Sequence, residues 1–598
     1  MRNFSSIVSI LLVFFFVADR AALHWAIPVY KGGQMNKLMV KKVPKKDRMD
    51  LAWQQEREMT QDPELGDVPK ERLIEAWKYT QQLIAQQGLR KAAIPTISWT
   101  ERGPNNCGGR TRAICVDLND ATRNTIWAGG VAGGLWKTTN IGASSPNWTP
   151  INDFFSNMAI TYIDQAKGNP NVMYFCTGEG NGNSDAVRGL GVWKSTNGGS
   201  TWTQLATTNN NSNFYYCNKV FTLGAGDTVF VCTMQGLFRS VNGGTTFTKV
   251  LGQGISSATG NRCYDIERTF NGTLFSSVSS SSNNTGTIHR STDGGATWST
   301  PATINTVSKR EIELAVSDYD NNVVWGLVEN ASTITGIIRS TNGGVTFSPV
   351  AGYPVDADTG IPANDFSRTQ AWYDLSIAVD PNDPTVCFVG GIDLFKTSDA
   401  GATWNQVSHW WGGYGFQEVH ADQHNAIFAP GSSTVAYFTN DGGVYRTTNA
   451  HASMPSILSK EINYNTTQFY ACDVHPTNSN YFLAGAQDNG SHRFNTAGVN
   501  GTSEVTGGDG AFCHIDQNQP SFQFTSYVYN NYYRSSNGGT SFTNVISSNT
   551  GRFINPTDYD DSMNVFYGAS GTGTFFRWSN PQTGTTTATV TLTGGPSA

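Results

Sequence analysis

Charged residues are scarce in this chain of 598 residues: they make up 14% of it, and the net charge is −6. Lysine and arginine form no cluster within the repeats described below, whereas proteins that bind nucleic acid concentrate these residues where they meet the phosphates. We therefore expect no nucleic-acid partner. Beyond residue 22 the sequence also lacks an apolar run of the roughly 20 residues that a membrane-spanning helix needs, so we expect no membrane span in the mature chain.

The cysteine pattern excludes the common cysteine-based sites. Nine cysteines are present, an odd number, and none follows the CxxC spacing of metal or redox motifs. Several lie in apolar β-type runs, as Cys115 and Cys176 do, which is typical of buried thiols. The sequence leaves one or two disulfides open.

The first 95 residues differ from the rest of the chain. Residues 1–22 combine Arg2, an apolar run over 7–17 and small residues at the end, which predicts a signal peptide and a secreted or extracellular protein, with attachment to the cell surface left open. Residues 23–95 contain a basic stretch at 37–48 and a helical apolar spacing at 73–89. We interpret 23–95 as a helical leader or prosegment that lies against the following domain.

Glycine is abundant, with 63 residues, and the chain repeats a short motif that contains it. The motif reads Ser-Thr-Asn-Gly-Gly-Ser-Thr-Trp at residues 195–202. The glycine pair supplies the positive φ of a tight turn, and the Asn or Asp side chain bonds to the turn backbone. Clear copies occupy residues 195–202, 240–247, 291–298, 340–347, 397–404 and 535–542, and weaker ones lie near Asn140, Asn449, Asn495 and Asn580.

The spacing of these hairpins predicts the architecture. Ten copies from Asn140 to Asn580 are about 49 residues apart on average, close to the ~40–50 residues of a four-stranded propeller blade. We predict an all-β fold: a β-propeller over residues 96–590 with about ten four-stranded blades and a short N-terminal helical leader. The spacing fits one large propeller or two consecutive propellers. Residues 591–598 are interpreted as a truncated tail or a linker.

The repeat resembles the Asp-box, S-x-D-x-G-x-T-W, of the sialidase-like superfamily. With Gly-Gly-Arg110 and the runs at 133–137, 420–424, 441–443 and 487–490, the chain resembles secreted bacterial Asp-box (BNR) repeat proteins. These are grouped with the N-terminal domain of sortilins and with glycoside hydrolase family 74. The resemblance implies a propeller more firmly than an activity, because Asp-boxes occur in enzymes and in receptors.

The activities that the resemblance implies need different residues. The early Arg-Ile-Pro type motif of sialidases is missing, which argues against a sialidase. Family 74 xyloglucanases carry a catalytic aspartate in a first-blade run resembling T-D-V-G-G-x-Y-R, where this chain has Val131; a later match at 439–446 keeps Asp441. Sortilin-type propellers have ten blades and bind peptides or proteins in their channel, but the sequence shows no counterpart of their cysteine-rich module.

The candidate catalytic residues are carboxylates in or beside glycine-rich loops. Glycoside hydrolysis needs an acid and a base or nucleophile about 5–10 Å apart. For each carboxylate, a turn-forming role is the alternative. The candidates are Asp441, with a partner among Asp422, Asp488 and Asp509.

Aromatic and polar residues in the same loops are candidates for ligand binding. Trp410, Trp411 and Tyr414 lie beside two glycines, and they could stack on a sugar ring or fill the core between two blades. The predicted ligand-binding residues are Arg110, Glu179, Trp410, Trp411, Tyr414, Gln487 and Asn489.

Residues 418–424 suggest a metal site. If they form a strand, alternate side chains lie on one face. Glu418, His420, Asp422 and His424 would then offer two carboxylates and two imidazoles to a divalent metal, or would line the channel and bond to neighbouring blades. The motifs require no cofactor, and a divalent metal ion is the one we leave open.

These observations predict an exported β-propeller that binds a glycan or protein ligand through its loop face and channel. A glycoside hydrolase acting on a polysaccharide is the alternative, and a structural adhesion or matrix module is a third. The expected partner is a polysaccharide or an extracellular protein.

Overall fold

The computed structural model describes residues 49–69, 71–87, 100–181, 186–252, 262–280, 284–299, 301–305, 308–362 and 364–592. The predicted signal peptide, the basic stretch at 37–48 and residues 593–598 of the predicted tail lie outside these ranges. Two helices come first, α2 (Met49–Thr60) and α3 (Glu71–Gln87), and a short 3-10 turn, η2 (Ser212–Phe214), interrupts the strands. No helix in the described ranges is both long and apolar enough to cross a membrane.

The described chain otherwise consists of strands in ten sheets, which confirms the predicted all-β fold and its number of hairpins. Eight sheets have four antiparallel strands and one has three; the next has five because β16 joins it in parallel beside β20. The first four sheets contain β1 (Thr111–Val116), β2 (Ile126–Gly130), β3 (Gly134–Thr138) and β4 (Trp148–Pro150); β5 (Ile160–Gln165), β6 (Met173–Thr177), β7 (Val192–Ser195) and β8 (Thr203–Gln204); β9 (Cys217–Leu223), β10 (Thr228–Thr233), β11 (Gly236–Ser240) and β12 (Thr248–Leu251); and β13 (Arg262–Arg268), β14 (Leu274–Ser279) and β15 (Thr287–Ser291). The next three contain β16 (Thr303–Ile304), β17 (Glu311–Val316), β18 (Val324–Asn330), β19 (Thr333–Ser340) and β20 (Thr346–Pro349); β21 (Ser376–Val379), β22 (Cys387–Gly390), β23 (Leu394–Thr397) and β24 (Asn405–Gln406); and β25 (Asn425–Phe428), β26 (Ala436–Asn440), β27 (Gly443–Thr447) and β28 (Ile457–Ser459). The last three contain β29 (Phe469–Val474), β30 (Phe482–Ala486), β31 (Ser491–Phe494) and β32 (Ser503–Thr506); β33 (Cys513–Ile515), β34 (Gln523–Tyr527), β35 (Asn530–Ser535) and β36 (Thr543–Ser548); and β37 (Thr557–Asp560), β38 (Val565–Gly571), β39 (Thr574–Ser579) and β40 (Thr586–Thr591).

The first seven sheets close into a ring. Their innermost strands β1, β5, β9, β13, β17, β21 and β25 contact one another in that order, and β25 returns to β1. At the closure, Trp136, Tyr437 and Tyr464 share one buried core, and Trp148 Nε1 donates to the carbonyl of Lys460 at 2.7 Å. This part of the chain is therefore a seven-bladed propeller.

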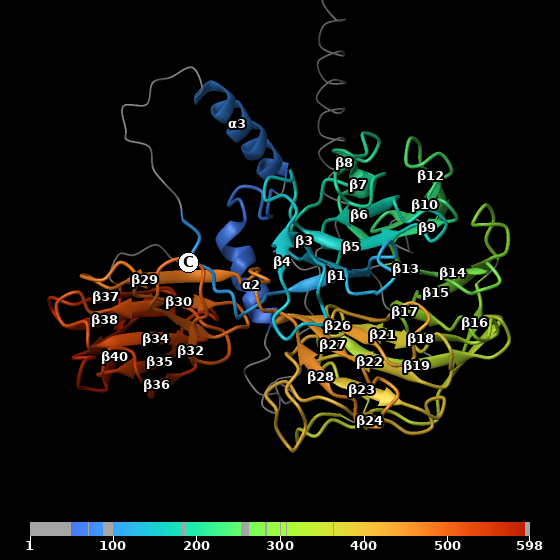
Figure 1. Cartoon of the computed structure of the whole chain (residues 1–598). Coiled ribbons are helices and arrows are strands. Elements are labelled where there is room, and N and C mark those ends of the chain that lie inside the picture. Colours follow the sequence, from blue (N-terminus) through green and yellow to red (C-terminus); the bar gives the residue numbers. More distant parts are fainter. Residues whose placement is uncertain are drawn as a thin grey trace, which may run out of the picture.

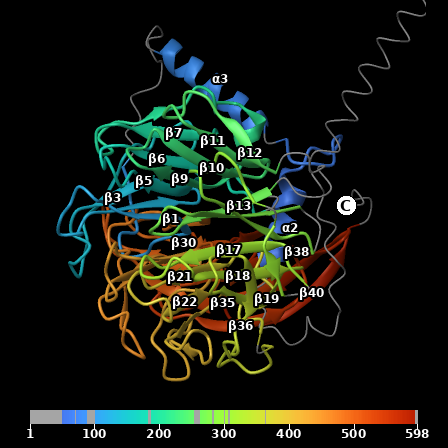
Figure 2. The ribbon, with the colours of Figure 1, turned by 90° about the vertical axis from the view of Figure 1, so that its right-hand side faces the viewer.

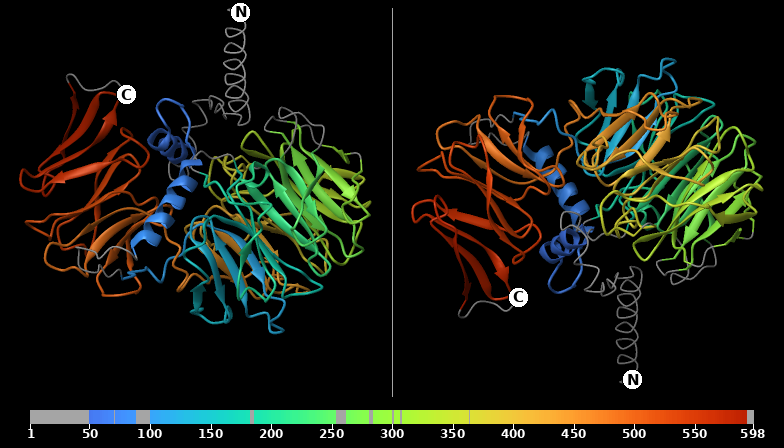
Figure 3. Two further views of the ribbon diagram at one scale, coloured as in Figure 1. Left: turned by 90° about the horizontal axis from the view of Figure 1, so that it is seen from above. Right: turned by 90° about the horizontal axis from the view of Figure 1, so that it is seen from below.

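Strands β29–β40 form three further blades, here called the second array, which lie beside the ring (Figures 1 and 3). Helix α2 docks on the second array, since Gln55 exchanges two hydrogen bonds with the backbone of Ile554 and Glu58 pairs with Arg552 at 2.8 Å. Helix α3 lies at the ring (Figure 2), where Ile74 packs into the core of the first two blades. Of the two arrangements that the sequence allows, the structure has two consecutive propeller units, not one ten-bladed ring.

The repeated turn has the predicted geometry at residues 195–202. The Ser195 hydroxyl accepts from the backbone N–H of Gly199 at 2.9 Å, and the side-chain oxygen Oδ1 of Asn197 accepts from the backbone N–H of Thr201 at 2.9 Å. Gly199 has φ +80°, and a Cβ there would lie 2.3 Å from the ring of Trp127 in the preceding blade. The glycine therefore provides both the turn and the close approach of two blades.

Packing rather than disulfide bonding holds the blades together. All nine cysteines are free thiols, and six of them are buried. Cys176 and Cys217, for example, belong to one apolar core with Phe238. This confirms the interpretation of most cysteines as small buried side chains.

Candidate functional site

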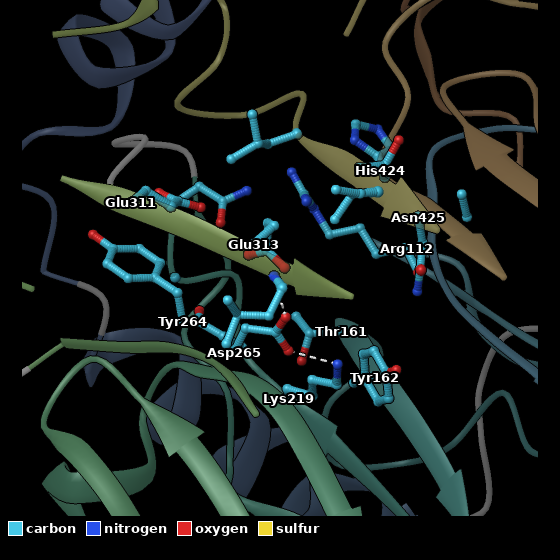
Figure 4. A pocket seen from close by; sticks show the side chains of 18 of the residues that line it. Arg112, Thr161, Tyr162, Lys219, Tyr264, Asp265, Glu311, Glu313, His424 and Asn425 are labelled. Carbon is cyan, nitrogen blue, oxygen red and sulfur yellow. Dashed lines mark hydrogen bonds and ion pairs between the residues drawn. The ribbon is translucent and has the colours of Figure 1, made fainter. Parts of the chain in front are cut away.

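The channel of the ring contains a polar cavity of about 120 Å³ (Figure 4). One water needs roughly 10–15 Å³ of such space, so the cavity is large enough for several. Two cationic side chains line it, Arg112 and Lys219. Five carboxyl side chains outnumber them: Glu179, Asp265, Glu267, Glu311 and Glu313. The channel is therefore acidic.

Ion pairs compensate part of this charge. Lys219 lies 2.5 Å from Asp265 and 2.6 Å from Glu267. The predicted ligand-binding residue Glu179 is buried beside Arg112 at 3.5 Å, and the same guanidinium stacks on the ring of Tyr373 at 4.2 Å. Glu179 therefore lines the channel cavity and has a cation beside it.

For Glu311, the effect of burial on the carboxyl group outweighs the effect of the nearby arginines. Burial, with the nearby Glu329 carboxylate, raises the pKa of Glu311 to about 8, against the opposing effect of Arg310, Arg112 and Arg262. The native state therefore keeps the Glu311 proton between its ordinary pKa, near 4.5, and about 8, while the unfolded chain loses it.

This difference predicts that Glu311 destabilises the protein as the pH rises from about 4.5 to 8. We expect Glu311→Gln to raise the melting temperature by a few degrees at pH 8.5 and to change it little at pH 4.5. Differential scanning calorimetry at both pH values measures the shift, with the exposed Glu64→Gln as a control. An equal shift at both pH values would contradict the burial of an ionisable carboxyl at this position.

The loops at one end of the channel hold the predicted catalytic residue Asp441. Its carboxyl Oδ1 lies 2.5 Å from His424 Nε2, and both side chains are fully buried. Burial, with Asp488 as the second cause, raises the pKa of Asp441 well above its usual range. Burial also lowers the pKa of His424, as do the nearby Arg112 and Arg110. Both shifts favour the neutral forms of this pair.

The second array meets the ring here, at what we call the junction. Asn489 donates from Nδ2 to the carbonyl of Asp441 at 3.1 Å, and His420 Nε2 lies 3.0 Å from the carbonyl of Asp488. Arg110 donates to Gln468 at 3.2 Å. The structure thus brings Arg110, Asp441, Asp488 and Asn489 together, although the sequence places them in three separate segments.

The other predicted residues near the junction bond within the protein. The backbone of Asp488 donates to Asp509 Oδ1 at 3.1 Å, and Gln487 is buried with its backbone N–H on Gln468. Two glycines allow close packing beside these loops, because a Cβ on Gly108 would lie 2.3 Å from the carbonyl oxygen of Gly442, and one on Gly109 would lie 2.3 Å from that of Thr466. These contacts order the loops on each side of the junction.

Residues 418–424 do not form the strand on which the suggested metal site depended, so their side chains do not share one face. Strand β25 begins only at Asn425, and Asp422 has φ +68°, which breaks the alternation of an extended chain. The four side chains separate as a result: Glu418 is exposed, His420 reaches Asp488, Asp422 accepts from Gln370 at 3.4 Å, and His424 binds Asp441.

The predicted aromatic residues form a cluster at a different place, around His409. The ring centroids of Trp410, Trp411 and Tyr414 lie 5.9, 5.1 and 5.2 Å from that of His409. Trp411 is 51% exposed and Tyr414 is 59% exposed, so neither fills the core between blades. Gly413 allows this arrangement, since a Cβ there would lie 2.3 Å from the Trp411 ring.

Beneath these rings lies a buried charged cluster that the sequence analysis missed. Arg368 pairs with three carboxylates, at 3.1 Å from Asp356, 2.7 Å from Asp358 and 3.4 Å from Asp393. Trp410 Nε1 donates to Asp358 at 3.4 Å. A signal was present: residues 350–375 form a connection between β20 and β21 that is much longer than most, and long loops in compact domains are commonly functional.

The β-propeller fold is shared with proteins of known structure. A family 74 xyloglucanase from Xanthomonas campestris is 15% identical, with a TM-score of 0.59 over 84% of this chain and 76% of that one. A family 74 enzyme from Niastella koreensis is 15% identical with a TM-score of 0.46, over 83% of this chain and 74% of that one. PorZ, a surface component of the type-IX secretion system of Porphyromonas gingivalis, is 11% identical with a TM-score of 0.46, over 83% and 60%.

No family model matches the sequence, and no curated protein sequence is significantly similar to it. The likeness to the Xanthomonas enzyme supports the class of protein that the strands define, a β-propeller. At 15% identity it supports the fold and nothing finer.

Proposed function

We propose that this chain is an exported propeller that binds a polysaccharide through the exposed rings of Trp411 and Tyr414. The observation that carries the proposal is the exposure of these two rings on a rigid support. Large apolar side chains exposed together on a folded surface commonly mark a binding site, and a flat ring stacks on the apolar face of a sugar.

The support under the rings favours a preformed site. Tyr414 has φ +57°, a conformation that a bulky residue adopts only when its surroundings hold it there. The carboxylate of Asp358, whose side chain is 14% exposed, lies close by and can accept hydrogen bonds from hydroxyl groups. A sugar offers both an apolar face and hydroxyls, so it suits this site better than an apolar ligand would. The xyloglucanase that shares the fold makes xyloglucan the first polysaccharide to test.

Hydrolysis at the junction is the second candidate function. Asp441 from the ring and Asp488 from the second array are close enough that Asp488 raises the pKa of Asp441. The buried Oδ2 atoms of both have no hydrogen-bond partner among the described residues. Two carboxyl groups are what glycoside hydrolysis requires. However, Asp441 is fully buried, so a substrate would reach it only after the junction opens.

A panel of polysaccharides, xyloglucan included, separates the two functions. Retention of the purified chain and release of reducing ends are measured together on the wild type and on Asp441→Asn. We expect retention without release, and equal retention of Asp441→Asn. Release that Asp441→Asn abolishes would establish the hydrolase instead. Failure of every polysaccharide to retain the chain would overturn the proposal and favour a protein partner or an adhesion role.

A further inference from the structure

The charged cluster under the aromatic rings contains a set of potential metal ligands. One donor atom from each of Asp356, Asp393 and His409 lies within 4.8 Å of the other two. All three side chains are fully buried. They come from three separate segments: the connection after β20, the turn before β23 and the connection after β24. The tertiary fold therefore brings them together, and no sequence motif does.

His409 shows that the set is incomplete without a further group. Its Nδ1 atom is buried and has no hydrogen-bond partner among the described residues. Its Nε2 atom lies 3.4 Å from Asp358 Oδ2, without hydrogen-bond geometry. Leaving a buried polar atom unsatisfied is unfavourable, because it loses its hydrogen bonds to water without replacing them. A buried histidine with such a nitrogen beside two buried carboxylates is arranged as a metal ligand would be.

Asp393 also retains an unused oxygen. Its Oδ2 accepts from Gln406 at 3.3 Å and lies 3.4 Å from Arg368, whereas its buried Oδ1 has no partner among the described residues. Arg368 therefore occupies one side of the carboxylate and leaves the other for a second cation.

The net negative charge of the ionised cluster favours binding of a divalent cation. Three carboxylates, Asp356, Asp358 and Asp393, surround the single guanidinium of Arg368, so the ionised cluster carries a net charge of −2 with His409 neutral. Uncompensated charge is costly in a buried site. Asp358, whose side chain is 14% exposed, is the carboxylate of the cluster that reaches solvent.

We propose that Asp356, Asp393 and His409 bind a divalent transition-metal cation, Zn²⁺ or Mn²⁺, beneath the aromatic cluster. Mixed imidazole and carboxylate donors suit these ions, whereas Ca²⁺ prefers six to eight oxygen ligands. Three protein ligands leave coordination positions for water or for an oxygen of a bound molecule. The site goes beyond the polysaccharide proposal and does not depend on it, because the metal alone tests it.

The test is isothermal titration of Zn²⁺ into the tag-free full-length chain after treatment with a chelator. We expect one ion per chain, an affinity at least tenfold weaker in His409→Asn and in Asp393→Asn, and an unchanged affinity in His420→Asn. The last variant is the matched control, because His420 belongs to the set at 418–424 that the sequence suggested. Thermal melts establish that each variant is folded.

Three results would overturn the proposal: no stoichiometric binding of Zn²⁺ or Mn²⁺ by the wild type, binding unchanged by His409→Asn and Asp393→Asn, or tight binding of Ca²⁺ alone. X-ray absorption of the Zn²⁺-loaded wild type keeps the test decisive if a variant fails to fold. We expect one imidazole and carboxylate oxygens at about 2.0–2.2 Å from zinc. A coordination shell without histidine would contradict the site.

Discussion

Trp411→Ala with Tyr414→Ala is expected to weaken polysaccharide binding at least about 30-fold. Truncating a Trp or Tyr that anchors an interface commonly weakens binding by about 2 kcal/mol or more, which is roughly 30-fold in Kd. Both rings are exposed, so their removal should leave the melting temperature within about 2 °C of the wild type. Affinity electrophoresis in gels containing the retained polysaccharide measures the change.

Tyr319→Ala provides the matched control for this prediction. Tyr319 is 73% exposed and lies in the turn between β17 and β18, outside the aromatic cluster. We expect it to bind the polysaccharide as the wild type does. Equal affinity of the double variant and the wild type would show that the ligand lies elsewhere, whereas equal weakening by Tyr319→Ala would indicate non-specific adhesion to aromatic surface.

Arg368→Met is expected to produce the largest loss of stability. Arg368 is fully buried and holds three carboxylates within 2.7–3.4 Å. Removing one partner of a buried ion pair leaves uncompensated charge and commonly destabilises a protein by about 3–5 kcal/mol. Calorimetric melts of the full-length chain, with the second array present, should show a clearly lower melting temperature for the ring.

Two further variants test the cause of that loss. Arg239→Met removes an arginine that is only partly buried and lies 6.0 Å from the ring of Phe230, and it should shift the transition much less. Arg368→Met combined with Asp393→Asn should recover part of the stability, because one unpaired acid is removed with the cation. A melt of Arg368→Met indistinguishable from the wild type would contradict the buried network.

The blades could be predicted from the sequence because their signal is local. Each clear turn motif fixes its own hairpin through a hydroxyl residue, an Asn or Asp and glycine that lie within five residues of one another, as Ser195, Asn197 and Gly199 do. Ring closure depends instead on contacts such as Trp148 with Lys460, which are 312 residues apart. No local pattern reports such a contact, so the choice between one ring and two units needed the structure.

For the candidate sites as well, features local in the sequence could be predicted, whereas contacts between distant segments could not. Trp410, Trp411 and Tyr414 could be singled out together because they are close in the chain, but their position beside Arg368 and its carboxylates was not predictable. The set at 418–424 is not brought together, because these residues form no regular strand, Asp422 has a positive φ, and the side chains contact different groups. The set at Asp356, Asp393 and His409 was missed because three distant segments supply it.

The most direct test of where a ligand binds is hydrogen exchange of the backbone amides with and without the retained polysaccharide, measured by mass spectrometry. The account predicts slower exchange at residues 408–416 and at the neighbouring 356–362, with little change elsewhere. Slower exchange at 439–442 and 487–490, with none at 408–416, would contradict it and place the ligand at the junction beside Asp441 and Asp488.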